Sequence, residues 1–219
     1  MRGMEFWPRT LFEFAGVEVT ETVTTTWLVM ILLAAASYAV SRRLSLAPSL
    51  IQEVVEALVE SIKTLVEDVL DVDAWEVIPF LGTLWIFIGA ANLVGLVPGL
   101  ESPTADVNTT FAFAFVSYLS VHYFGVRFQG VRGYLKHYSY PTVLLLPVHL
   151  MADLARTVAL SIRLFGNMLS GEMIAAILLA IVGLIVPVAM MLLHVLISIV
   201  QAYIFGALTL AFIAGGQVK

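Results

Sequence analysis

The sequence predicts an all-α polytopic membrane protein, a fold class supported by three observations. Hydrophobic residues make up 60% of the 219-residue chain and charged residues only 12%, whereas a soluble domain carries about 25% charged residues. The apolar residues are gathered into blocks long enough to cross a bilayer as helices. Most Lys and Arg residues lie beside these blocks, as is usual for loops next to a membrane. We treat residues 1–219 as a single membrane domain.

The first half of the chain predicts an outward-facing segment, two spans and one helix on the membrane surface. Residues 1–25 mix charged and aromatic side chains, and residues 26–41 form the first apolar block. In residues 49–70, apolar side chains recur with a period of 3.6 and the charged ones fall on the other side, which predicts an amphipathic interfacial helix. Residues 75–97 form the second span, which a Pro-Gly pair ends.

The second half predicts three further membrane helices. Residues 108–126 form the third span and are followed by a basic connection. Residues 142–185 are too many for one perpendicular span, so we expect this helix to tilt, kink or lie partly in the membrane plane. Residues 187–214 form the last helix. In total we expect five membrane-embedded helices and one interfacial helix.

Positive charges predict the orientation of the chain. Arg42 with Arg43, the connection 127–136 and Lys219 carry positive charge at the ends of apolar blocks, and such sites favour the cytoplasmic side. We therefore expect the N-terminus outside and the C-terminus in the cytoplasm.

One arginine, Arg163, lies in the middle of a long apolar stretch. A guanidinium cannot lose its charge, and at the bilayer centre it costs about 2.5–3.5 kcal/mol on insertion scales. We expect a chain that keeps this cation to use it, either to meet a carboxylate or to steer an ion.

Polar side chains form one stripe on each of the last two predicted helices. Their spacing of three, four, seven or eight residues places each set on one helical face. The two sets are His149, Asp153, Arg156, Arg163, Asn167 and Ser170, and His194, Ser198, Gln201 and Thr209. An antiparallel hairpin turning near Gly183 would pair Arg163 with Gln201, Asn167 with Ser198, Arg156 with Thr209 and Glu172 with His194. We expect a continuous polar seam through the membrane with Arg163 inside it.

Parts of this seam have a purely structural alternative. Hydrogen bonds between membrane helices average about 0.6 kcal/mol, which would suffice to explain the hydroxyl residues. Glu172 and His194 could form a structural ion pair or a proton relay, since imidazole titrates near neutral pH. Asp153 and Arg156 are three residues apart and could simply neutralise each other.

Several other functions find no support in the sequence. No phosphate-binding Gly-rich loop with Lys, no nucleophile motif and no His-Glu-x-x-His spacing occurs. With no cysteine in the chain, thiolate metal sites are excluded. We expect no catalytic site, cofactor or metal, and no nucleic-acid partner, because the few basic residues lie next to membrane segments.

Around Arg163 the sequence resembles subunit a of F-type ATP synthases, the membrane stator of the rotary motor. The resemblance covers about residues 20–214. It rests on Arg163-Leu-Phe-Gly-Asn167-Met, Gly171-Glu172, His194, Gln201-Ala-Tyr-Ile-Phe, Pro98 and Ala105-Asp106-Val107-Asn108 with Thr110. It implies that the last two helices form a long, tilted hairpin against a ring of c subunits. It also implies b-type peripheral stalk subunits, one copy of this chain per complex, and a bacterial inner membrane.

The resemblance also implies residue roles. Arg163 would face each ring carboxylate, with Asn167 and Gln201 at polar positions near it. The half-channel residues would be Glu172, His194, Ser198, Asp106, Asn108, His149, Asp153 and Arg156. His149 departs from the family, because many relatives carry Glu at this position, and this leaves the lining of the pathway open there.

The function expected is ion translocation through two offset half-channels, coupled to ring rotation and ATP synthesis. Whether the ion is H⁺ or Na⁺ would depend on the c subunit. The alternative is a self-contained secondary ion transporter or channel. Such a protein would need its own carboxylate at mid-membrane and often shows internal repeats, whereas here the mid-membrane charge is a cation and no repeat is visible.

Overall fold

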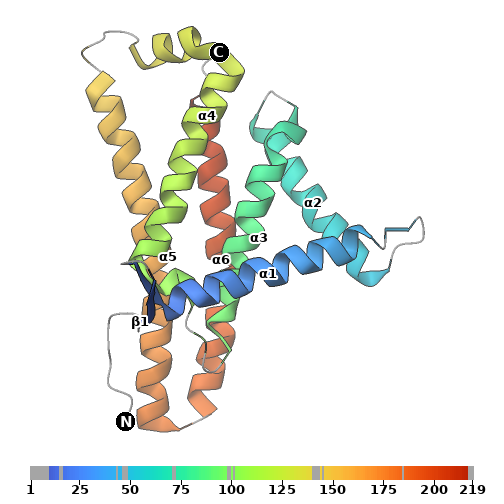
Figure 1. Ribbon diagram of the computed structural model, residues 1–219, viewed down its shortest axis with the longest axis vertical. Helices are drawn as coiled ribbons and strands as arrows, with labels where there is room; N and C mark the ends of the chain where they lie inside the picture. The colour runs from blue at the N-terminus through green and yellow to red at the C-terminus, as the bar shows by residue number, and fades with distance from the viewer. Residues whose placement is uncertain are drawn as a thin grey trace.

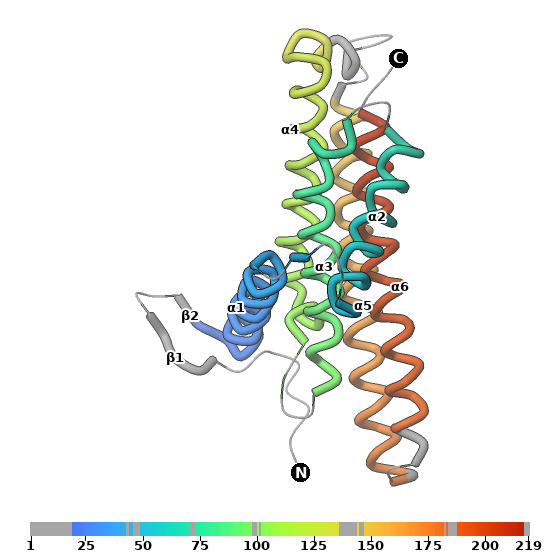
Figure 2. The backbone as a smooth tube through the Cα atoms, turned by 90° about the vertical axis from the view of Figure 1, so that its right-hand side faces the viewer, coloured from blue at the N-terminus to red at the C-terminus, as the bar shows by residue number. Residues whose placement is uncertain are grey.

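The computed structural model describes residues 10–14, 17–42, 44–45, 49–70, 73–97, 100, 102–139, 144, 146–183 and 185–216, and most of them are helical. The elements in chain order are β1 (Thr10–Phe14), β2 (Val17–Thr20), α1 (Glu21–Ser41), α2 (Leu50–Val69), η1 (Ala74–Glu76), α3 (Ile78–Val94), η2 (Pro103–Ala105), α4 (Val107–Ser139), α5 (Leu146–Val182) and α6 (Ile185–Gly215). Helices α3 to α6 run side by side along the long axis, and α1 crosses them at a steep angle (Figures 1 and 2).

The N-terminal segment corrects the all-α expectation, because β1 and β2 form a small antiparallel sheet with Phe14 opposite Val17. Both strands are rich in β-branched and aromatic residues, which favour extended backbone. Helix α1 then begins at Glu21, five residues earlier than predicted. Arg43, Lys219 and residues 1–9, on which the predicted orientation partly rests, lie outside the described residues.

Within the described residues, the buried side chains of helix α1 all lie in its first turns. Its buried side chains are Thr22, Thr25 and Val29, which share one face and lie toward α3, whereas most of the rest of the helix is exposed. Because α1 and the α5–α6 hairpin cross steeply (Figure 1), they cannot both be perpendicular to one membrane plane.

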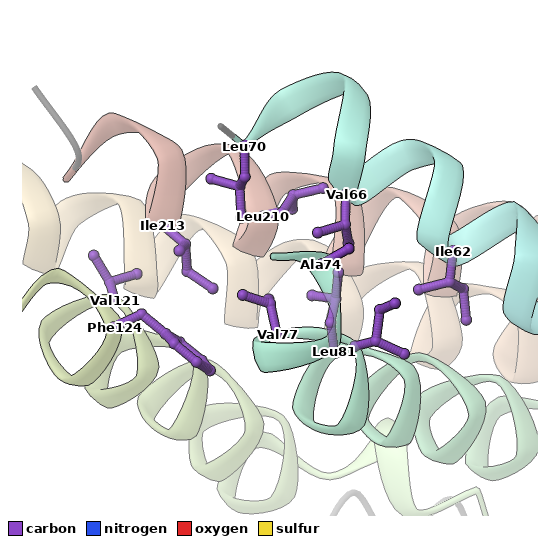
Figure 3. Close-up of a cluster of buried hydrophobic side chains, with 11 residues drawn as sticks. Ile62, Val66, Leu70, Ala74, Val77, Leu81, Val121, Phe124, Leu210 and Ile213 are labelled. Atoms are coloured by element: carbon purple, nitrogen blue, oxygen red, sulfur yellow. The ribbon is translucent and has the colours of Figure 1, made fainter. Parts of the chain in front are cut away.

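Helix α2 is amphipathic, and its C-terminal half belongs to the core. Ile62 and Val66 are buried, and Leu70 follows them into a cluster that also holds Leu81 of α3 and Ile213 of α6 (Figure 3). The glutamates of α2 are exposed on its other side. Its position at a membrane interface stays a prediction.

Helix α4 corrects the predicted end of the third span. Residues 127–136, expected to be a connection, are helical to Ser139. The two helical parts meet at Gly130, whose φ of 72° and ψ of 162° break the regular backbone. Only glycine adopts such a conformation readily. After the kink the chain turns back, and the Tyr134 ring packs so closely on Gly125 that a Cβ there would overlap it.

Helices α5 and α6 form an antiparallel hairpin. They contain 37 and 31 residues, or about 55 Å and 46 Å at 1.5 Å per residue. The hairpin end extends beyond the other helices (Figure 2). Gly183 has a φ of 78°, which places the turn where the sequence predicts it.

Four helices of the described part are long and apolar enough to cross a membrane: α1, α4 over Val107–Leu135, α5 over Pro147–Ile181 and α6 over Val188–Gly215. Helix α3 is apolar but has only 17 residues. The chain is therefore a helical integral membrane protein, and the number of five embedded helices stays a prediction.

The packing of α3 on α6 yields the first test. The Trp85 indole lies against Gly206, where a Cβ would overlap the ring, and its Nε1 donates to the Tyr203 carbonyl at 3.0 Å. We expect Gly206→Ala to displace the indole and destabilise the chain by about 1–3 kcal/mol, as overpacking usually does. Thermal unfolding of the purified chain in detergent measures this. Gly215→Ala, where nothing lies within 4 Å, is the control, and equal stability of the two variants would contradict the packing.

Candidate functional site

Arg163 lies on the exposed side of α5 and not inside the hairpin. Among the described residues, ion pairs join Arg156 with Asp153, Arg127 with Glu76, and Lys63 with two glutamates, and none includes Arg163. The expected seam with Arg163 in its interior is therefore wrong. The buried face of α5 is formed instead by residues about a third of a turn away, such as Leu160, Leu164 and Met168.

The exposed surface of α5 has two different sides. The side next to Arg163 carries small residues, namely Ala155, Ala159, Gly166 and Ser170. The other side, which lies further around the helix from Arg163, carries the bulky residues Met151, Leu154, Val158 and Ile162. Small residues let another helix approach closely in a membrane. The cation thus borders the part of the surface best shaped to receive another helix.

Asn167, one turn after Arg163, connects α5 with α6. Its Nδ2 donates to Oε1 of Gln201 at 2.6 Å. Gln201 is 2% exposed, and its Nε2 is buried with no hydrogen-bond partner among the described residues. Within the described residues, one amide donor of Gln201 therefore stays unpaired at the level of Asn167, one turn after Arg163.

The register of the hairpin agrees with the predicted pairing near the turn and departs from it further along the helices. Gln201 is bonded to Asn167 rather than opposite Arg163, and Ser198 Oγ donates to Met168 Sδ at 3.8 Å. Thr209 contacts Ser117 of α4 at 2.8 Å rather than Arg156. The turn lies where the spacing predicts it, and the contact of His194 with Gly171 keeps the predicted register there. The partner of Gln201, however, is four residues further along α5 than predicted. On α6 the predicted side does face the interior, because Ser198, Gln201 and Thr209 are buried. On α5 apolar residues such as Leu164 form most of the contact instead.

A buried polar cluster lies beyond Arg163 toward the hairpin turn. Asn92 of α3 donates from Nδ2 to the Ser198 carbonyl at 3.1 Å and accepts from Thr104 Oγ1 at 2.7 Å. The hydroxyls of Ser102 and Thr104 are 2.8 Å apart, and Ser102 donates to the Ala91 carbonyl. All four of these polar side chains, including that of Ser198, are fully buried. We call Asn92, Ser102, Thr104, Ser198 and Glu172 the turn-side cluster.

Two glycines make room for the predicted pair Glu172 and His194. The carboxylate of Glu172 lies beside Gly95, where a Cβ would be 3.1 Å from Oε1. The His194 ring lies against Gly171, where a Cβ would overlap it. The contact between Glu172 and His194 themselves stays a prediction.

A second polar group lies on the other side of Arg163, at the N-terminal end of α5. Arg156 Nη1 is 3.2 Å from Asp153 Oδ1, and its guanidinium lies over the Phe212 ring, 5.6 Å from the centroid. Asp153 and Arg156 line a small cavity with Tyr118 and His122 of α4. Half-buried His149 lies one turn before Asp153. The sequence predicted Asp153, Arg156 and His149 as candidates but not His122.

An apolar plug separates the two polar groups. It consists of Leu84, Ile88, Leu160, Leu164, Ala202 and Phe205, contributed by α3, α5 and α6. At 1.5 Å per residue, Asp153 lies about 15 Å before Arg163 along α5 and Glu172 about 14 Å after it. Beside the plug, at the contact of α4 with α5, buried Ser161 donates to Thr110 at 3.3 Å. The interior at the level of Arg163 is therefore closely packed and mostly apolar.

Asp106 and Asn108 lie at the start of α4. Asp106 Oδ1 accepts from the backbone N–H of Asn108 at 3.1 Å, and Oδ2 accepts from Thr109 Oγ1 at 3.1 Å. By accepting from the Asn108 N–H, this carboxylate satisfies one of the backbone donors that the first turn of a helix leaves unpaired. A structural role for Asp106 is thus visible, and its role in a half-channel stays a prediction.

Residues that the sequence analysis did not single out complete both polar groups. Asn92 could have been noticed, because an amide inside an apolar span has to be satisfied by the protein. Ser102 and Thr104 lie in a connection, where hydroxyl residues are common. Within the described ranges, no group of three or more His, Cys, Asp or Glu residues could hold a metal ion.

Comparisons with known proteins place these features in a family. The sequence model described as ATP synthase A chain matches residues 23–214. ATP synthase subunit a 2 of Pelobacter propionicus is 47% identical over 205 residues, which cover 94% of this chain and 90% of the relative. ATP synthase subunit a of Legionella pneumophila is 44% identical over 206 residues, covering 94% and 90%. Subunit a 1 of Hahella chejuensis is 45% identical, covering 92% and 86%.

The hairpin register can be tested by disulfide crosslinking, because the chain contains no cysteine. A Cβ on Gly171 would lie 3.0 Å from His194 Cγ, so two Cβ atoms there would be within about 4.5 Å, the range a disulfide needs. We expect Gly171→Cys with His194→Cys to crosslink on oxidation, measured as protection from maleimide labelling. Arg163→Cys with Gln201→Cys is the control and should stay reactive. Crosslinking of the control pair alone would contradict the register.

Proposed function

The chain belongs to the ATP synthase A chain family, and on this premise we propose that it is the stator subunit through which ions reach and leave a ring of c subunits. The observation that carries this proposal is the exposed position of Arg163 beside a small-residue surface. A permanent cation facing lipid is expensive, so a partner with negative charge must cover it. The ring carboxylates implied by the family would supply that charge.

The apolar plug supports a route that leaves this chain. Because Leu164 and Phe205 are completely buried at the level of Arg163, an ion could not pass straight from one polar group to the other through the interior. It would have to move onto a carboxylate of the ring, travel with the ring and return on the other side of Arg163. This detour would couple ion flow to rotation.

The two polar groups are suited to be the two half-channels. The turn-side cluster, with His194, would connect the outer side to the ring, with Asp106 and Asn108 nearby at the start of α4. Asp153, Arg156 and His149 would belong to the inner half-channel. Asn167 and Gln201 would hold the hairpin beside Arg163, where the free amide donor of Gln201 could bind a carboxylate or a water.

Charge energetics gives each step a direction. A ring carboxylate neutralised by an ion from the outer half-channel can enter lipid, whereas the charged form cannot do so cheaply. When that carboxylate reaches Arg163, the cation favours its ionised form and thus the release of the ion. A potential of 100 mV contributes about 2.3 kcal/mol per charge, so several ions are needed for each ATP made elsewhere in the complex.

The setting follows from the same premise. We place the chain in a bacterial inner membrane, with the N-terminus outside and the C-terminus in the cytoplasm, as one copy beside the c ring and b-type stalk subunits. It would contain no catalytic site of its own. If α1 is perpendicular to the membrane plane, the α5–α6 hairpin is strongly inclined to the membrane normal (Figure 1). An inclined hairpin could contact the ring along much of its length.

A self-contained secondary transporter is the alternative. It would carry its own ion-binding carboxylate at mid-membrane, and the carboxylates of α5, Asp153 and Glu172, are each more than two turns away from Arg163. Family membership favours the stator.

Replacing Arg163 tests the proposal. We expect Arg163→Ala and Arg163→Gln to reduce ATP-driven ion pumping in inverted vesicles to background, because no charge would then meet the ring carboxylate. Arg127→Gln is the matched control: this arginine pairs with Glu76 at 2.9 Å near the end of the bundle and should leave pumping largely unchanged. Normal pumping by Arg163→Ala would refute the proposed role.

Replacing Leu164 tests the plug. Leu164→Asn would place a polar group between the two polar groups, and we expect a faster passive ion leak in vesicles that contain this chain without the c ring. Leu164→Ala is the control, because an apolar cavity stays dry. Equal leaks from both variants would show that the plug does not keep the half-channels apart.

A further inference from the structure

A small cavity between α4, α5 and α6 contains two titratable groups, Tyr118 and His122, that the proposed function leaves without a task. Its volume is about 20 Å³, and its polar lining consists of Ser117, Tyr118, His122, Asp153, Arg156 and Thr157. A cavity volume of about 10–15 Å³ is enough for one water molecule if polar groups are present to bind it. The cavity is therefore large enough and polar enough to hold one water.

His122 is held in this wall by its neighbours on α4. Its Nδ1 is 3.0 Å from the Tyr118 carbonyl oxygen. Because a carbonyl can only accept, Nδ1 carries the hydrogen in this bond and Nε2 is the basic nitrogen. The imidazole lies 4.3 Å from the Tyr118 ring and 6.0 Å from the Tyr134 ring, between centroids. These contacts orient the imidazole ring, and Nε2 is the ring nitrogen that can accept a proton.

The groups that share the cavity come from all three helices. Helix α4 supplies Tyr118 and α5 supplies Asp153 and Arg156, whereas α6 supplies Phe212 and no charged lining residue. The side chain of Asp153 is 15% exposed and that of Arg156 52%. Arg156 therefore runs from the cavity wall to the surface of α5, on the side of the helix where Arg163 lies.

We propose that this cavity is a proton-exchange site in the inner half of the ion pathway and that His122 is its proton carrier. A proton released from the ring would reach the cavity water and bind Nε2, giving an imidazolium that the Asp153 carboxylate stabilises. The imidazolium would then return the proton to water on the inner side and regain its neutral form. Imidazole suits this task because it can accept a proton on one ring nitrogen while the other donates a hydrogen bond.

This inference rests on the proposed function and deepens it by naming the ion as a proton. A metal cation would need several oxygen ligands in a space that holds one water, and it would meet the guanidinium of Arg156. Proton transfer needs only a chain of donors and acceptors, which Tyr118, His122, Asp153 and one water can provide.

The test uses the complete ATP synthase in vesicles from which the catalytic head has been stripped. Passive proton flow toward the inner side is driven by a potassium diffusion potential in sodium-free buffer. In the unmodified complex, we expect the rate to rise in one step as the inner pH increases, because release of the proton to the inner water becomes more favourable. We expect His122→Gln to conduct about tenfold more slowly, a barrier change of about 1.4 kcal/mol, and to lose this step in the pH profile.

Two further variants separate proton transfer from structure. Added imidazole should restore proton flow to His122→Ala in proportion to the unprotonated fraction of the added imidazole. If imidazole only filled the space left by the histidine, the rate would not depend on that fraction. Tyr123→Phe is the control, because Tyr123 is the next residue in the chain and 59% exposed. It should keep both the rate and the pH step. If His122→Gln does not assemble, the imidazole dependence of His122→Ala decides in its place.

The outcomes distinguish this inference from the proposed function. If Arg163→Ala loses pumping but His122→Gln keeps the rate and the pH profile of the unmodified complex, the role of His122 is overturned and the proposed function is not. No response of an assembled His122→Ala complex to imidazole would overturn it as well. A requirement for sodium in the unmodified complex would overturn the assignment of the proton. Normal pumping in Arg163→Ala would refute the proposed function itself.

Discussion

The charge of Arg163 in an apolar layer is the constraint on which the rest of the structure depends. A guanidinium stays charged at any physiological pH, and no ion pair within the described residues neutralises it. If it were buried in the hairpin, a carboxylate of this chain would have to accompany it. On the surface of α5 it can instead meet a carboxylate that arrives and leaves. The small residues beside it allow that approach, and the bulky ones further around fit lipid.

The interior of the bundle makes this exposed position useful. The apolar plug fills the level of Arg163, and polar groups lie on both sides of it. Close contacts at glycines keep these parts together: Gly206 admits Trp85 between α3 and α6, Gly171 admits His194, and Gly95 lies against Ser102 and Glu172. A larger residue at these positions would displace the side chains that pack against them.

Much of this arrangement could be predicted from the sequence, and the errors have physical reasons. Long apolar blocks predicted the helices and Gly183 the turn, because block length and backbone freedom are local properties. The interior position expected for Arg163 was wrong, because a stripe of polar residues indicates a helical face and not which neighbour that face meets. Apolar contacts of Leu160, Leu164 and Met168 decided that. His122 and Thr104 became candidates only through neighbours that are distant in the sequence.

The central claim is that the ring binds to the surface of α5 beside Arg163, and crosslinking in the assembled complex tests it most directly. One cysteine is placed at Gly166 or, separately, at Val158, and a second next to the ring carboxylate. Both positions on α5 are exposed, but only Gly166 lies on the small-residue side. A disulfide to the ring from Gly166→Cys and none from Val158→Cys is the result the account predicts. A disulfide from Val158→Cys alone would contradict it.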